Sequence, residues 1–150
     1  MPWKVLIVVL ASAVSLIVFW QIEKPPGFES APNAGSPLCG KVEEGYPSKI
    51  LGEGRSRVDA RGVAVWGDSK VLLRCGVELP RPTLDPCMTV NGVDWVLVER
   101  VSDQRRKTLI TYGRNPAVEV TFSSDSPSVG DGLVDLSASV RLIPQKSKCL

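Results

Sequence analysis

The stretch MTVNGVDWVLV, residues 88–98, carries the strongest turn signal in this sequence. Asn91-Gly92 lies between two apolar runs, and this dipeptide accepts the positive φ angles of the tight turn that joins antiparallel strands. The stretch therefore predicts a β-hairpin with strands over 88–90 and 93–98.

Strand patterns continue on both sides of this hairpin. The additional predicted strands are GVAVW (62–66), KVLLRC (70–75), TLITY (108–112) and VEVTF (118–122). The first two flank a turn at residues 67–69 and form a second predicted hairpin. In VEVTF, apolar and polar residues alternate, which is typical of a strand with one covered face.

A helix follows the last predicted strand. Its apolar positions recur at helical spacing, with Ser128 or Asp131 available as N-cap and Pro144 closing the segment. These positions are Val129, Leu133, Leu136, Val140 and Ile143. A short helix within residues 39–51 is opposed by Gly40, Gly45 and Pro47. We predict an α+β fold, in which one or two helices cover an antiparallel sheet of four or five strands.

The N-terminal segment has a different character. Residues 5–20 read VLIVVLASAVSLIVFW and contain no charge, so we predict a transmembrane signal anchor over 1–22. A cleaved signal peptide is the alternative, but no A-x-A site follows Trp20. Lys4 before the apolar run predicts a cytoplasmic N-terminus, with residues 23–150 outside the cell membrane. Residues 23–37, rich in proline, glycine and serine, predict a tether, and 38–150 predict the exported domain.

Four cysteines lie in the predicted exported part, where thiols oxidise. Three pairings are possible, and we favour Cys39 with Cys75 and Cys87 with Cys149, because these pairs tie the leading segment and the C-terminal tail to the sheet. The spacing lacks C-x-x-C pairs, which argues against a zinc site or a redox dithiol. We expect no metal and no cofactor.

Composition restricts the possible chemistry. The chain of 150 residues contains no histidine, which excludes Ser-His-Asp and Cys-His catalysis as well as histidine-ligated metals. The net charge is +2, and the one dense basic cluster, residues 105–107, has no interleaved aromatic residue. We therefore expect no nucleic-acid partner.

Several sequence blocks, in this order, carry a resemblance to a known family. They are Trp66-Gly67-Asp68, Arg74-Cys75-Gly76-Val77, Val90-Asn91-Gly92-Val93-Asp94-Trp95, and Gly113-Arg114 followed by VEVTF. From about Cys39 onward, the sequence resembles the domain of unknown function 3515 family of actinobacterial membrane proteins. This resemblance implies an N-terminal membrane anchor and an exported domain without an assigned activity.

Two hypotheses for function follow from the residues in these blocks. The first is a binding or assembly module of the cell envelope, anchored in the membrane by residues 1–22 and holding an envelope protein or a wall polymer. Its candidate surface consists of Trp66, Asp68, Arg74, Asp94, Trp95 and Arg114. Core packing is the ordinary alternative for both tryptophans.

The second hypothesis is a histidine-free hydrolase or transferase that uses Asp68 and Asp94 as acid and base. Both aspartates also have structural explanations: Asp68 in a turn, and Asp94 bonded to a neighbouring strand or paired with Arg74 or Arg114. We assign no catalytic residue. Catalysis requires the two carboxylates to converge in a pocket, whereas a module predicts dispersed carboxylates and an exposed apolar patch.

Overall fold

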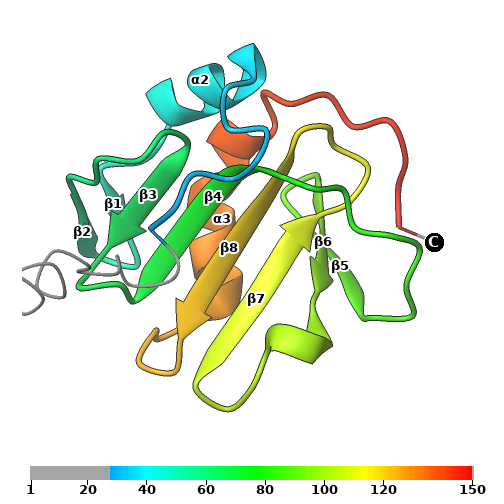
Figure 1. Cartoon of the computed structure of the whole chain (residues 1–150). Helices are drawn as coiled ribbons and strands as arrows, with labels where there is room; N and C mark the ends of the chain where they lie inside the picture. Colours follow the sequence, from blue (N-terminus) through cyan, green and yellow to red (C-terminus); the bar gives the residue numbers. More distant parts are fainter. Residues whose placement is uncertain (1–27, 150) are drawn as a thin grey trace, which may run out of the picture.

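A computed structural model describes residues 28–149 of the chain, and its centre is one antiparallel sheet of eight strands. The strands are β1 (Lys49–Ile50), β2 (Glu53–Ser56), β3 (Val63–Trp66), β4 (Val71–Val77), β5 (Cys87–Val90), β6 (Val93–Leu97), β7 (Arg106–Thr111) and β8 (Ala117–Ser123). Their order is β1-β2-β3-β4-β8-β7-β6-β5. Two meanders, β1 to β4 and β5 to β8, thus join where β4 pairs with β8 (Figure 1).

The predicted α+β class and antiparallel sheet are confirmed, but the predicted size of the sheet is wrong. The sheet has eight strands rather than four or five. Six of the eight strands coincide with strand segments predicted from the sequence, and the other two are β1 and β2, which together offer one buried apolar side chain, Ile50, and no alternating pattern. The turn between them contains Leu51 at φ 53°. This backbone conformation is unusual for a leucine, and no sequence pattern predicts it.

Two α-helices lie on one face of the sheet within the described residues. Helix α2 (Pro37–Glu44) begins at Ser36, whose Oγ accepts a hydrogen bond from the amide of Leu38 at 3.3 Å. A short helix is therefore present even though Gly40 lies inside it, and it ends before Gly45 and Pro47. Helix α3 (Val129–Val140) begins at Ser128, whose Oγ accepts from the amide of Asp131 at 3.2 Å.

The core lies between these helices and the sheet. Its largest side chains are completely buried: Trp66, Trp95, Phe122, Ile50, Leu73, Leu109, Leu133, Leu136 and Ile143. Burial of one such side chain contributes about 1.5–3 kcal/mol, which makes this layer the main source of stability. We call the covered side of the sheet its helical face and the other side its open face.

Two disulfides fasten the ends of the domain. Cys39–Cys75 ties α2 to β4 with a Cα–Cα distance of 5.6 Å, and Cys87–Cys149 ties the C-terminal tail to β5 at 6.2 Å. The pairing favoured from sequence is therefore confirmed.

Residues 28–36, the second half of the predicted tether, cross the open face above β4 (Figure 1). The amide of Asn33 donates to the carbonyl of Gly76 at 2.9 Å, and Ala31 and Ala34 are buried. Gly76 has φ +97°, and a Cβ there would collide with the Asn33–Ala34 backbone, so the crossing depends on this glycine.

The predicted anchor over 1–22 lies outside the described residues. Within residues 28–149, neither helix has the length and apolar character needed to cross a membrane.

Candidate functional site

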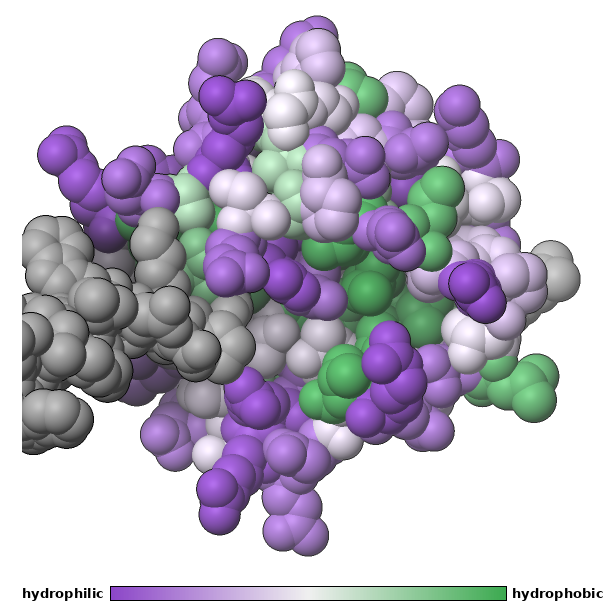
Figure 2. Space-filling view, viewed as in Figure 1, coloured by the Kyte–Doolittle hydropathy of each residue, from purple (hydrophilic) through white to green (hydrophobic). Residues whose placement is uncertain are grey.

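The open face of the sheet carries an elongated hollow, which we call the sheet groove. It consists of three adjoining cavities of about 320, 500 and 470 Å³. Arg74 and Glu119 line the first two cavities, and Val96 lines the second and third, so the three cavities lie next to one another. Figure 2 shows hydrophobic side chains gathered in this hollow, with hydrophilic side chains around them.

The alternation of side chains along each strand determines which residues form the floor of the groove. Because Trp95, Leu109 and Val120 point into the core, their neighbours Val96, Ile110 and Glu119 point to the open face. The register sets Val96 directly opposite Ile110 and Arg74 directly opposite Glu119. The floor therefore has an aliphatic part beside an ionic part.

The ionic part is neutral as a pair. Arg74 donates from Nε at 2.9 Å and from Nη2 at 2.5 Å to the same Oε1 of Glu119. The two side chains are 30% and 17% exposed. Such a partly exposed pair is worth at most about 1 kcal/mol, so its main effect is to leave neither charge free in the floor.

A proline-rich loop, residues 78–86, and the short 3₁₀ helix η1 (Glu99–Val101) form the walls. Their apolar side chains lie at the rim with large exposed fractions, 49% for Leu79, 104% for Leu84 and 44% for Val101. Apolar groups left exposed around a hollow are typical of interaction surfaces. Pro80, Pro82 and Pro86 restrict the loop, so this wall has limited freedom to collapse into the groove.

The groove runs along β7 and is about as long as that strand. It extends from Arg106 at the start of that strand to Tyr112 just after its end. Six steps of about 3.3 Å give roughly 20 Å, which matches an extended ligand of about six residues. The arrangement can hold a long, narrow ligand, and it combines aliphatic contacts with charged side chains in all three cavities, such as Arg106, Arg81 and Asp85.

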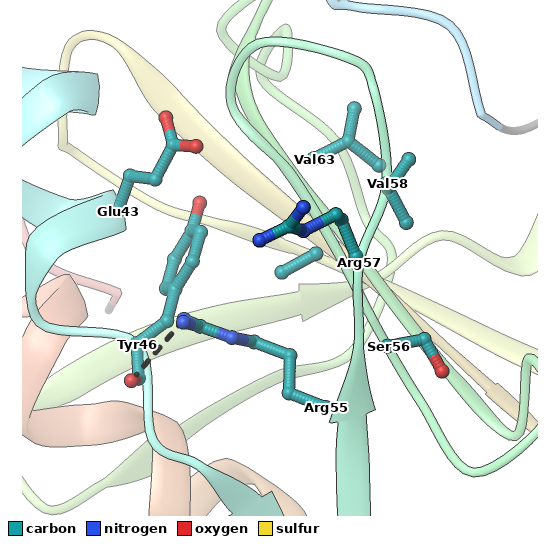
Figure 3. Close-up of a pocket in the computed structure, with 8 residues that line it drawn as sticks. Glu43, Tyr46, Arg55, Ser56, Arg57, Val58 and Val63 are labelled. Atoms are coloured by element: carbon teal, nitrogen blue, oxygen red, sulfur yellow. Dashed lines mark hydrogen bonds between the residues drawn. The ribbon is translucent and has the colours of Figure 1, made fainter.

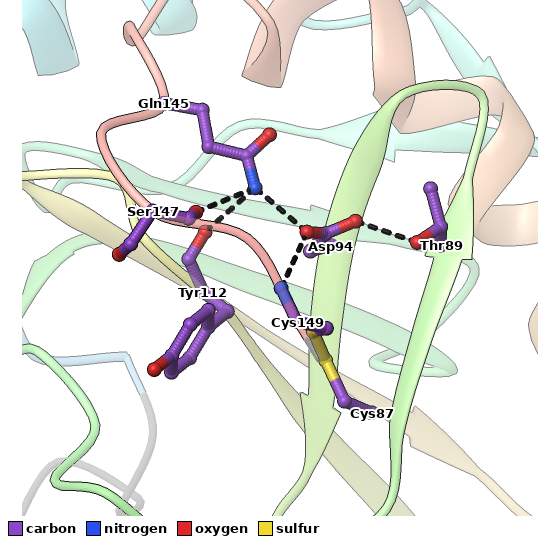
Figure 4. The surroundings of a disulfide bond; sticks show 7 residues. All are labelled: Cys87, Thr89, Asp94, Tyr112, Gln145, Ser147 and Cys149. Carbon is purple, nitrogen blue, oxygen red and sulfur yellow. Dashed lines mark hydrogen bonds between the residues drawn. A yellow bond between two sulfur atoms is a disulfide. The ribbon is translucent and has the colours of Figure 1, made fainter.

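At the Tyr112 end, Asp94 holds the C-terminal tail (Figure 4). Its Oδ1 accepts from the hydroxyl of Thr89 at 2.6 Å, and its Oδ2 accepts from Nε2 of Gln145 at 2.8 Å and from the amide of Cys149 at 2.9 Å. Burial raises the pKa of Asp94, but these hydrogen bonds outweigh that effect and hold the pKa below its usual value. The carboxylate is thus an ionised structural acceptor.

Arg114 fastens the same tail from the other side. Its guanidinium donates to the carbonyl of Gly92 at 2.9 Å and to the carbonyl of Ile143, and the side chain is 4% exposed. Burial lowers its pKa. Asp94 and Arg114 therefore lie together, as fasteners of residues 143–149.

The other predicted site residues lie elsewhere. Trp66 and Trp95 are in the core with no exposed surface, and Nε1 of Trp66 donates to the carbonyl of Pro47 at 3.0 Å. Asp68 is exposed in the turn between β3 and β4, and Arg74 is in the floor of the sheet groove. The structure does not bring these six residues into one surface.

Asp68 and Asp94 do not converge. Asp68 precedes β4, and three inter-strand steps separate β4 from β6, the strand of Asp94. At about 4.8 Å per step, the two aspartates lie at least roughly 14 Å apart. Both carboxylate oxygens of Asp94 are also occupied, Oδ1 by Thr89 of β5 and Oδ2 by the tail. The pair lacks the common pocket that acid and base catalysis requires.

No sequence pattern predicted the sheet groove. Its wall is a loop without periodicity, and outward-facing Val96 and Ile110 read as ordinary strand residues. The available signal was the run of prolines at 80, 82 and 86 between two strands, which indicates a restrained loop rather than a short turn.

Comparison with known families gives one match. The model of the family described as protein of unknown function (DUF3515) matches residues 4–148. The resemblance seen in the sequence blocks is thereby confirmed, and the match extends it toward the N-terminus. Neither the curated proteins nor the solved structures yield a match to this chain.

Proposed function

The chain belongs to the DUF3515 family of proteins of unknown function, and from this premise we propose that it is a membrane-anchored binding or assembly module of the cell envelope. The observation that carries this proposal is the sheet groove: a hollow about as long as β7, with a floor that is partly aliphatic and partly ionic, and with exposed apolar side chains at its rim. Surfaces of this kind serve recognition.

The alternative, a histidine-free hydrolase or transferase, receives less support from the geometry. It requires Asp68 and Asp94 to act on one bond, and they are separated by several strands. The groove itself contains an ion pair, Arg74 with Glu119, in which each group satisfies the other rather than standing free as an acid or base.

The ligand that best fits the groove is an extended polypeptide segment of another envelope protein. Wall polymers are the second candidate, but carbohydrate recognition relies on exposed aromatic faces, and Tyr112 is the aromatic residue that lines the groove. Val96, Ile110 and Leu79 instead offer aliphatic contacts, which suit apolar side chains of a peptide.

The proposed location rests on two features of the chain. Residues 5–20 form an uncharged apolar run preceded by Lys4, which supports a signal anchor over 1–22 with a cytoplasmic N-terminus. All four cysteines are paired in disulfides, as is usual in oxidising compartments. Both features support residues 23–150 being extracytoplasmic.

Site-specific photo-crosslinking in intact cells tests the binding role. A photoreactive side chain at Leu79, on the rim, should capture one defined partner, whereas the same group at exposed Ala138 of α3, away from the groove, should not. Adding Ile110→Arg, which places a bulky charge on the aliphatic floor, should abolish capture. Equal capture from both positions, or capture that survives Ile110→Arg, would contradict the proposal.

A protease test addresses the location separately. Protease added to cells without their outer wall layers should digest the domain after its disulfides are reduced, while a cytoplasmic marker stays intact. Protection of the domain until the membrane is dissolved would place residues 23–150 on the cytoplasmic side and contradict the proposed topology.

A further inference from the structure

A second cavity, of about 290 Å³, lies between β2, β3 and the end of α2 (Figure 3). It shares no lining residue with the sheet groove. Its wall residues include Glu43, Tyr46, Arg55, Arg57 and Ala64. The volume is near the lower end of the roughly 300–1,000 Å³ that small-molecule sites occupy, so the cavity suits a small ligand.

Two guanidinium groups form one wall. Arg55 stands opposite Trp66 in the register of β2 and β3, and Trp66 points into the core, so Arg55 belongs to the helical face. Arg57 follows two residues later and points the same way. Figure 3 shows both side chains directed toward Tyr46.

Neither guanidinium is neutralised within residues 28–149. Arg55 donates from Nη1 to the carbonyl of Tyr46 at 3.4 Å, and no carboxylate of the described residues lies within ion-pair distance of Arg55 or Arg57. Guanidinium groups match carboxylates with two parallel hydrogen bonds, so this wall is suited to a carboxylate ligand.

The opposite wall is acidic. The carboxylate of Glu43 accepts from the amide of Gly62 at 3.4 Å and stands beside the hydroxyl of Tyr46. That hydroxyl donates to the carbonyl of Gly62 at 3.4 Å, and burial raises its pKa, so Tyr46 stays neutral. Glu43 therefore supplies the negative charge of this wall.

A ligand of one sign does not suit this arrangement. A simple anion would leave Glu43 facing it, and a simple amine would face Arg55 and Arg57. Inward-pointing charges also protect exposed sheet edges, but at Arg55 the edge of β2 is already covered, because the Arg55 amide donates to the carbonyl of Ser48 at 2.9 Å. The floor is apolar at Ala64, which points to the same face as Trp66 and is nearly buried at 3% exposure.

We infer that this cavity binds a small zwitterion, an α-amino acid with a short aliphatic side chain. Its carboxylate lies against Arg55 and Arg57, its ammonium group against Glu43, and its side chain on Ala64. The inference is independent of the sheet groove and of the proposed envelope partner.

Nuclear magnetic resonance titration of the full chain tests this inference with three probes: L-alanine, propionate and ethylamine. The last two each carry one of the two charges of alanine. L-Alanine should bind about tenfold more tightly than either, the difference expected for one additional hydrogen bond between charged groups. Equal affinity for propionate and L-alanine would reduce the cavity to an ordinary anion site and overturn the inference, as would an absence of saturable binding.

Variants test which side chains bind the carboxylate and the ammonium group of L-alanine. Arg57→Gln should weaken L-alanine binding by about tenfold, and Glu43→Gln should reduce the affinity for L-alanine to that for propionate. Arg61→Gln removes the same charge from a neighbouring position outside the cavity and should leave binding unchanged. An equal loss in Arg61→Gln would show a diffuse charge effect and overturn the inference. Tryptophan fluorescence, to which buried Trp66 and Trp95 contribute, verifies that each variant is folded.

Discussion

Asp94→Asn should destabilise the protein by about 2–3 kcal/mol. Three donors share the carboxylate in the native state, from Thr89, Gln145 and Cys149. The amide keeps the shape of the side chain, and Thr89 can reverse its hydroxyl, so each contact persists as a neutral hydrogen bond. Hydrogen bonds to a charged group contribute about 1.5–3 kcal/mol and neutral ones about 0.5–1.5, so each contact loses about 1 kcal/mol.

The stability lost in Asp94→Asn should become smaller in strong acid. The pKa of Asp94 is lowered in the native state, so its ionised form stabilises the fold. That contribution is fully present above the ordinary aspartate pKa, roughly 4, and is lost as the pH falls through the lowered native pKa. The free-energy difference between wild type and Asp94→Asn should therefore be constant from neutral pH down to about pH 5 and shrink only in stronger acid.

Guanidinium chloride unfolding, followed by tryptophan fluorescence, to which buried Trp66 and Trp95 contribute, measures this difference at each pH. Asp68→Asn is the matched control, because Asp68 is exposed in a turn and makes none of these contacts, so its unfolding curve should match wild type. A loss below about 1 kcal/mol, smaller than even one weakened contact predicts, would refute the assignment of Asp94 as the fastener of the tail. A difference that does not change in strong acid would refute its ionised state.

Three further outcomes are expected. Under limiting reductant, peptide mapping should find Cys87–Cys149 opened first, because Cys87 is exposed while both sulfurs of the other disulfide are fully buried. Gly76→Ala should lower the melting temperature because its Cβ would collide with backbone, whereas Gly40→Ala, in open space on α2, should raise stability by about 1 kcal/mol. Ser128→Ala should cost about 1 kcal/mol in denaturant unfolding through loss of the α3 cap.

Local signals predicted much of the fold. Asn91 and Gly92 adopt φ angles of 47° and 74°, as expected for the hairpin turn, and the strands on both sides end within one residue of their predicted limits. The cap at Ser128 and the apolar spacing placed the start of α3 correctly, but the helix ends at Val140, before the predicted last position Ile143. These features are encoded by residues a few positions apart, which is why sequence patterns identify them.

The candidate site depends on contacts between distant residues, and here the sequence was less informative. The partners of Asp94 include Gln145 and Cys149, which are 51 and 55 residues away. The sheet groove requires the β4–β8 pairing, which no local pattern specifies. Trp66 and Trp95 looked equally suited to a surface and to a core, because an aromatic residue on a strand has the same pattern in both settings.

The position of the disulfides has a kinetic consequence. One bridge closes residues 39–75 and the other closes 87–149, so neither crosses the pairing of β4 with β8. An oxidised unfolded chain is thus two closed loops joined by a short linker, and refolding must bring them together without covalent guidance. The encounter of β4 with β8 should therefore limit the folding rate, and substitutions such as Leu73→Ala or Val120→Ala at that junction should slow folding more than equally destabilising changes within either loop.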